Sequence, residues 1–343
     1  MITGNIAGKT AGTSLFAVLT VIGVLVSGYL PILGSLVLAL AGVPALLVSL
    51  AWGGLWFLVY FILTVVSLGW LGGWASGAIL VPMLLAPAAL FAFLINSEVE
   101  TLKAVFLAVF LACGFSMSLW MIAPALGETG TKMWAQREQL KLWEREFEVK
   151  FNKSAESKTV DQTITTVFLE QIREWVDFVS LLIPFTFLFV WHLLSVLVFY
   201  FGGRAWGAKF GIKIEPFSKF SSWKFDWNLI WLFAAGWFLF YMSESFLDSR
   251  LIFAAKMVGA NLLAISKILY LIMGFSLLFW MFEKYQISVP NRIGLSFLVI
   301  LFYQVREILV WFGIIDVWAD FRAPAPVAKP GDDDQDNDDD SFF

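Results

Sequence analysis

The sequence predicts an all-α protein, a polytopic transmembrane bundle of about eight or nine helical spans, and three observations support this fold class. Hydrophobic residues make up 59% of the 343 residues, whereas soluble domains contain roughly 45–50%. Charged residues make up 15%, against about 25% in soluble domains. The mean hydropathy is +0.80, and a soluble fold of this length has too little interior to bury 35 Phe and 17 Trp.

Nine apolar runs are long enough to cross a membrane, because a hydrocarbon core of about 30 Å requires roughly 20 apolar residues per helix. The expected spans are residues 14–30, 32–51, 54–71, 76–95, 103–124, 176–201, 227–246, 257–282 and 293–315. The first two are separated at Pro31, since proline disfavours a helical conformation at the preceding residue. If the second run is short or re-entrant, the count is eight.

Two polar interruptions divide the chain. Residues 125–174 separate an N-terminal membrane bundle of about five spans (1–124) from a C-terminal membrane bundle of about four spans (175–322). The second interruption, residues 202–226, carries five Lys and Arg against two acids. Short loops of this kind stay cytoplasmic, so we expect this loop inside the cell. The basic residues summed over both sides of the membrane favour the opposite orientation.

The segment 125–174 has apolar residues at helical spacing. Its first apolar set is Leu140, Trp143, Phe147 and Phe151, and its second set is Ile164, Phe168, Ile172 and Trp175. This pattern is typical of amphipathic helices, and we expect an extramembrane helical hairpin on the membrane surface or on the bundle. A solvated connector is the alternative.

The C-terminal residues 323–343 form an acidic tail. They contain Pro, Gly and the run DDDQDNDDD, with very few apolar side chains. Such a segment cannot offset the entropy lost on ordering, so we expect it to be disordered.

The composition excludes several kinds of site. One histidine, His192, and one cysteine, Cys113, cannot supply a zinc site that needs several His or Cys ligands. His192 lies in an apolar run without a nucleophile-elbow sequence, and we expect it to bond to a neighbouring helix. The stretch 4–10 is one residue too short for a phosphate-binding loop. No basic patch indicates nucleic-acid binding, and we expect no metal, no cofactor and no enzymatic activity.

Small residues gather before the first apolar run. They are Gly4, Ala7, Gly8, Ala11 and Gly12. On a helix they form overlapping small-xxx-small pairs, which allow two helices to approach closely within a membrane. We therefore interpret them as a helix-docking face.

Polar and charged residues occur inside the last two expected spans. They are Asn261, Lys267, Gln304, Arg306 and Glu307. Charges at bilayer depth are costly and indicate a function or an ion pair. We expect Asn261, Lys267 and Glu307 to face the bundle interior, because lipid offers them no partner. A Lys267–Glu307 contact would either lock the two helices together or contribute to a ligand site, and we treat all five residues as candidate ligand contacts.

Three stretches resemble the YybS-like family of bacterial multi-pass membrane proteins. They are residues 260–275 (ANLLAISKILYLIMGF), residues 312–322 (FGIIDVWADFR), and residues 29–34 (YLPILG) followed by Trp52-Gly53. The resemblance covers nearly the whole chain and implies a location in the bacterial inner membrane. The family is distantly similar to the substrate-binding S components of energy-coupling-factor vitamin transporters, which are small helical bundles that capture a vitamin.

The similarity to S components implies a way of meeting a partner. S components dock on a membrane coupling protein through an Ala-x-x-x-Ala face of their first helix. Here that face would be Ala7-x-x-x-Ala11 or Thr13-x-x-x-Ala17. The resemblance implies no ligand contacts.

Two functions follow as expectations. The first is a substrate-binding or transport component that captures a small molecule for uptake. The alternative is a non-transporting membrane scaffold that recruits partners through the 125–174 insert and the acidic tail. A binding component needs an interior with a few convergent polar groups, whereas a scaffold can be packed solid.

Overall fold

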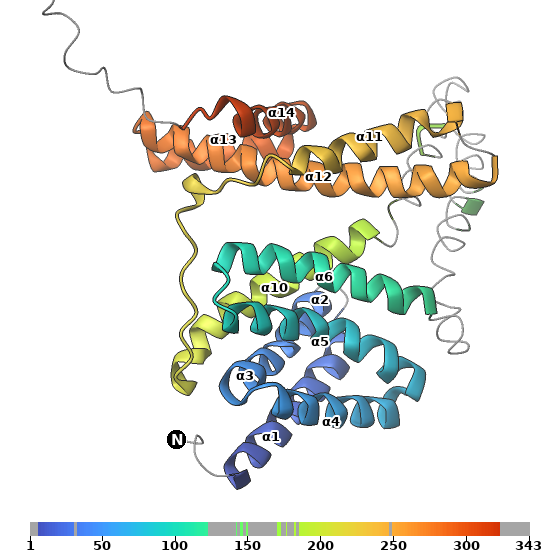
Figure 1. The fold of residues 1–343 in the computed structure, drawn as a ribbon, viewed down its shortest axis with the longest axis vertical. Helices are drawn as coiled ribbons and strands as arrows, with labels where there is room; N and C mark the ends of the chain where they lie inside the picture. The colour runs from blue at the N-terminus through green and yellow to red at the C-terminus, as the bar shows by residue number, and fades with distance from the viewer. Residues whose placement is uncertain are drawn as a thin grey trace, which may run out of the picture. The chain divides into compact units, whose positions relative to one another are not determined.

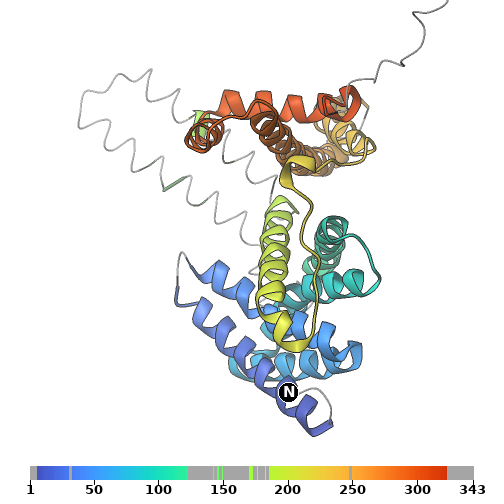
Figure 2. The same ribbon diagram turned by 90° about the vertical axis from the view of Figure 1, so that its left-hand side faces the viewer.

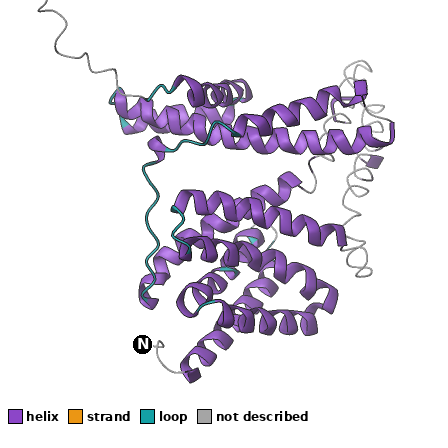
Figure 3. Cartoon of the chain, in the orientation of Figure 1, coloured by secondary structure: helices purple, strands orange, loops and turns teal. Residues whose placement is uncertain are grey.

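The computed structural model describes residues 6–30, 33–122, 185–246 and 249–322, with isolated positions between residues 142 and 182. The regular elements in these residues are all helices, joined by turns and loops (Figure 3). The predicted all-α fold class is therefore confirmed. The predicted tail, most of the predicted hairpin and Gly4 lie outside the described residues.

Among the described residues, seven helices are long and apolar enough to cross a membrane, and most of them are labelled in Figure 1. The first five candidate spans are Ile6–Ser27 (α1), Gly34–Trp52 (α2, Gly34–Ala41, and α3, Val43–Trp52), Gly54–Gly72 (α4), Gly77–Asn96 (in α5, Trp74–Asn96) and Thr101–Leu119 (in α6, Thr101–Ile122). The last two are Phe185–Phe210 (α10, Phe185–Gly207, with the short turn η2, Ala208–Phe210) and Ala254–Lys284 (in α12, Ser249–Lys284). The break expected at Pro31 is confirmed, because α1 ends at Ser27 and α2 begins at Gly34.

The described residues support at most eight spans, the lower of the two expected counts, rather than nine. The predicted span 227–246 forms α11 (Leu229–Phe246), whose apolar part, Leu229–Ser245, is shorter than the other spans. The predicted span 293–315 forms two helices, α13 (Val289–Leu301) and α14 (Tyr303–Ala319), bent by 103°. The structure therefore has seven candidate spans in its described residues, or eight if the bent pair counts as one. Hydropathy averaged over the whole run did not reveal the bend, because the two helices together are apolar enough for one span.

The chain divides into two compact units. The first unit comprises Met1–Ser218 and Trp231–Ser266, and the second comprises Lys219–Ile230 and Lys267–Phe343. In the first unit, α10 packs against α2, α3, α5 and α6, although the predicted hairpin separates it from them in sequence (Figures 1 and 2). Its core consists of large apolar side chains that are fully buried, including Leu46, Leu85, Phe91, Phe189 and Phe199.

Glycine permits a close approach between the helices of the second unit. A Cβ added at Gly313 of α14 would collide with the backbone oxygen of Tyr270 in α12. One added at Gly274 of α12 would collide with the backbone oxygen of Leu309 in α14. Because only glycine fits at both positions, α14 lies backbone to backbone against α12. This contact places the first turns of α14 beside the middle of α12.

Candidate functional site

Lys267 and Glu307 meet as an ion pair in the second unit. Lys267 lies near the middle of α12, and its Nζ is 3.0 Å from Oε2 and 3.2 Å from Oε1 of Glu307 in α14. The prediction that these two residues form a contact is confirmed. About 40% of the Lys267 side chain and 27% of the Glu307 side chain remain exposed within this chain. The pair is therefore only partly enclosed by the rest of the chain.

The other predicted ligand contacts on α14 lie next to the bend between α13 and α14. Phe302 has an extended backbone (φ −96°, ψ 114°), and α14 begins directly after it without a side-chain cap. Gln304 is exposed, and the Arg306 guanidinium lies 5.1 Å from the centre of the Tyr303 ring. Gln304, Arg306 and Glu307 thus occupy the first two turns of α14, at the bend between α13 and α14.

Asn261 is placed elsewhere and has a different environment. It is buried in the first unit. Its Oδ1 accepts hydrogen bonds from the backbone N–H (2.9 Å) and the Oγ1 (2.8 Å) of Thr186, and its Nδ2 donates to the backbone oxygen of Met257 (2.7 Å). Thr186 is the second residue of α10, and such N-terminal amide groups have no partner within their own helix. The amide of Asn261 therefore caps α10 from α12.

The small-residue face of α1 divides into an exposed part and a packed part. Ala7 and Ala11 are exposed, and Gly8 is half-buried. Gly12 is buried against Trp52 of α3, whose ring occupies the space that a Cβ would need. Of the two alternatives for an Ala-x-x-x-Ala face, Thr13-x-x-x-Ala17 is buried within the chain. Only Ala7-x-x-x-Ala11 is available to a partner.

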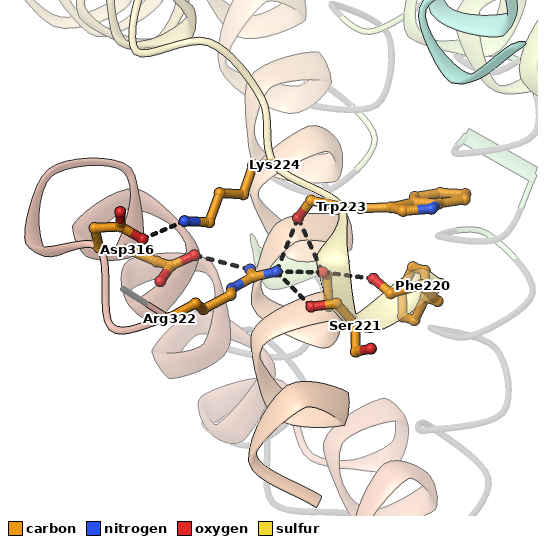
Figure 4. A network of polar contacts seen from close by, with 8 residues as sticks. Phe220, Ser221, Trp223, Lys224, Asp316 and Arg322 are labelled. Atoms are coloured by element: carbon orange, nitrogen blue, oxygen red, sulfur yellow. Dashed lines mark hydrogen bonds and ion pairs between the residues drawn. The ribbon is translucent and has the colours of Figure 1, made fainter. Parts of the chain in front are cut away.

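Sequence reasoning assigned no site role to a buried polar cluster at the end of α14, which we call the Arg322 cluster (Figure 4). It consists of the side chains of Arg322, Asp316 and Ser276 and the backbone carbonyl groups of Phe220, Ser221 and Trp223. All of these residues belong to the second unit.

Arg322 is the centre of this cluster. Its Nη2 donates to Asp316 Oδ2 at 2.8 Å, and only 5% of the Arg322 side chain and 0% of the Asp316 side chain are exposed. Its Nη1 lies 2.8 Å from the Ser221 carbonyl oxygen, 3.1 Å from that of Trp223 and 2.9 Å from Ser276 Oγ. The guanidinium therefore fixes the segment 220–223 to α12 and α14.

A second ion pair also connects this segment of the chain to the end of α14. Lys224 pairs with Asp320, which caps the end of α14. Asp316, Asp320 and Arg322 lie in the stretch 312–322, which pointed only to a family resemblance. The available signal was an acid and a base six residues apart at the end of the last apolar run. Two partners of Arg322 could not be found from the sequence, because they are backbone carbonyl groups about a hundred residues earlier in the chain.

The chain's only histidine lies in the core of the first unit. His192 Nε2 is 2.8 Å from Ser116 Oγ of α6, and both side chains are fully buried. The prediction that His192 bonds to a neighbouring helix is confirmed. Among the described residues, no group of three or more His, Cys, Asp and Glu side chains is arranged to hold a metal ion.

Comparison with known proteins gives one match. No match was found among the curated proteins or among the solved structures. The sequence pattern of the family described as "predicted membrane protein (DUF2232)" matches residues 18–317. This match covers most of the chain, including all of the candidate ligand contacts. The chain therefore belongs to the DUF2232 family of predicted membrane proteins.

Proposed function

We propose that the protein is a membrane-embedded binding component that captures a small polar molecule for uptake, similar to the S components of energy-coupling-factor transporters. The observation that carries this proposal is the half-exposed Lys267–Glu307 pair near the middle of α12. Lipid cannot hydrogen-bond to the exposed parts of these two groups. A small molecule with charged or hydrogen-bonding groups of its own would satisfy both.

The break between α13 and α14 supports the same location. In many membrane transporters, discontinuous helices form the substrate site, because their free ends present unpaired backbone groups. Here a bend of 103° precedes the turns that carry Gln304, Arg306 and Glu307. We therefore assign the ligand site to Lys267, Gln304, Arg306 and Glu307, and leave Asn261 to its role in capping α10.

The partner in this proposal is a membrane coupling protein. The candidate spans from α1 to α10 pack together in the first unit as a helical bundle, and this supports the proposed similarity to S components. Ala7 and Ala11 are exposed on its first helix and provide the docking face. The proposal places the protein in the inner membrane of a bacterial cell and assigns it no catalytic step.

The test is to identify small molecules that co-purify with the protein in mild detergent, by native mass spectrometry. The wild-type protein is expected to carry a bound molecule, and the Lys267→Met/Glu307→Gln variant is expected to lose it. The matched control is Lys256→Met/Glu244→Gln, because Lys256 and Glu244 form an exposed ion pair that also involves α12. The control should retain the molecule.

Two results would contradict the proposal. If a folded Lys267→Met/Glu307→Gln variant still carries the molecule, the ligand site does not include this pair. A wild-type protein that carries no small molecule from any growth condition would favour the scaffold function instead.

A further inference from the structure

Two buried polar atoms on α10 have no hydrogen-bond partner among the described residues. They are Nδ1 of His192 and Oγ of Ser195, and both side chains are fully buried in the first unit. The two residues are three positions apart on the helix, so their side chains lie on one face, with Cβ atoms about 5–6 Å apart. The other ring nitrogen of His192 is already bound to Ser116 Oγ at 2.8 Å.

We propose that a water molecule bridges His192 Nδ1 and Ser195 Oγ inside the first unit. Buried polar groups in proteins are nearly always paired, and ordered water supplies the partner where protein atoms do not. Two hydrogen bonds of about 2.8 Å to one oxygen atom span the separation expected for this pair of side chains.

The chemistry of the pair favours water over a ligand that can only donate or only accept. If Ser116 donates to Nε2, then Nδ1 carries the imidazole proton and needs an acceptor. If Ser116 instead accepts from Nε2, then Nδ1 needs a donor. Water serves in both cases, because it can donate and accept. The bound water extends the polar contact between α6 and α10 into a chain that runs from Ser116 through His192 to Ser195.

The single histidine allows a direct test. The protein is labelled with [15N]histidine, purified through a tag without histidine, and reconstituted in lipid bilayers. Solid-state NMR then measures how fast magnetisation from water protons reaches each of the three histidine nitrogens. We expect transfer to Nδ1 to be several-fold faster than transfer to the backbone nitrogen of His192, which lies within α10 and serves as the internal control.

Variants distinguish transfer through a bridging water from other routes by which magnetisation can reach Nδ1. Ser195→Val removes one anchor and fills its space, so transfer to Nδ1 should fall to the rate of the backbone nitrogen. Ser118→Ala is the control, because Ser118 is exposed on α6 and its Oγ donates to the Gly114 carbonyl oxygen of its own helix. It should leave the transfer unchanged. If water protons instead reach the ring by exchange with the Ser116 hydroxyl proton, transfer to Nε2 should be faster than transfer to Nδ1.

Three results would overturn the proposal. The first is wild-type transfer to Nδ1 that is no faster than transfer to the backbone nitrogen. The second is transfer that favours Nε2, and the third is fast transfer to Nδ1 that persists in Ser195→Val. The wild-type measurement is decisive even if Ser195→Val does not insert into the membrane.

Discussion

Two ion pairs of the second unit, Arg322–Asp316 and Lys267–Glu307, lie in different surroundings. Arg322 and Asp316 meet at 2.8 Å with 5% and 0% of their side chains exposed. Lys267 and Glu307 meet at 3.0 Å with 40% and 27% exposed. The guanidinium of Arg322 is also bound to two carbonyl groups and a hydroxyl group. The first pair is therefore fixed in the interior of the second unit, whereas the second pair is partly exposed.

Burial explains why the two pairs should respond differently to mutation. A charge left alone in the interior has lost its water and gains nothing in return, so removing one partner of a buried pair costs about 3–5 kcal/mol. Exposed pairs contribute about 0–1 kcal/mol, because water competes for both charges. Predictions that test this comparison follow, from the largest expected effect to the smallest.

Removing the Arg322 side chain should have the largest effect. Arg322→Met leaves Asp316 buried without its partner and leaves the carbonyl groups of Ser221 and Trp223 without a donor. We expect a loss of about 3–5 kcal/mol in the free energy of unfolding. Thermal unfolding in detergent and size-exclusion chromatography measure it.

A second change at the same cluster should recover only part of that loss. Asp316→Asn in the Arg322→Met background removes the unpaired charge but does not restore a donor to the carbonyl groups. A single Arg322→Met variant as stable as the wild type would refute the structural role of the Arg322 cluster.

Lys267→Met should have an intermediate effect. It leaves Glu307 without its partner, but part of the carboxylate is exposed. We expect a loss of about 1–3 kcal/mol, between the values for exposed and buried pairs. Adding Glu307→Gln should restore most of the stability, because the remaining pair is neutral. If the double variant is no more stable than Lys267→Met in thermal unfolding, the two charges do not stabilise each other.

Asn261→Ala tests whether burial has the same consequence for an uncharged group. The change leaves the Thr186 backbone N–H at the start of α10 without its acceptor. We expect a loss of about 1–2 kcal/mol in the free energy of unfolding, since an unsatisfied buried donor costs its desolvation. Asn228→Ala is the control, because Asn228 is exposed and its Nδ2 donates to the neighbouring Asp226 Oδ1. Equal melting temperatures for the two variants would contradict the capping role.

Lys256→Met should have a small effect. Lys256 pairs with Glu244, and 33% and 64% of the two side chains are exposed. We expect a change of at most about 1 kcal/mol in the free energy of unfolding. A loss as large as that for Lys267→Met would show that exposure does not distinguish these pairs.

Deleting residues 323–343 should have the smallest effect. The deleted segment has too few apolar side chains to join a core, and the deletion retains Arg322. We expect membrane insertion and the monodisperse species in detergent to be unchanged. Loss of that species in size-exclusion chromatography would show that the tail contributes to folding.

Local sequence determined the fold class and most of the spans. Apolar runs of about 20 residues form helices that match the membrane thickness, and this depends only on neighbouring residues. The break at Pro31 followed in the same way, because proline constrains the residue beside it. The Lys267–Glu307 contact was also predictable, since charges at bilayer depth need a partner and these two lie in consecutive expected spans.

Only the tertiary structure decided the bend at Phe302, the partner of Asn261 and the Arg322 cluster. The bend falls inside one expected span, directly before Gln304, Arg306 and Glu307, and these polar residues do not by themselves show that the helix breaks there. Asn261 bonds to Thr186, and Arg322 bonds to carbonyl groups, which every residue possesses. A backbone group becomes a specific partner only when the fold brings it close, and glycines such as Gly274 and Gly313 determine which helices come close enough.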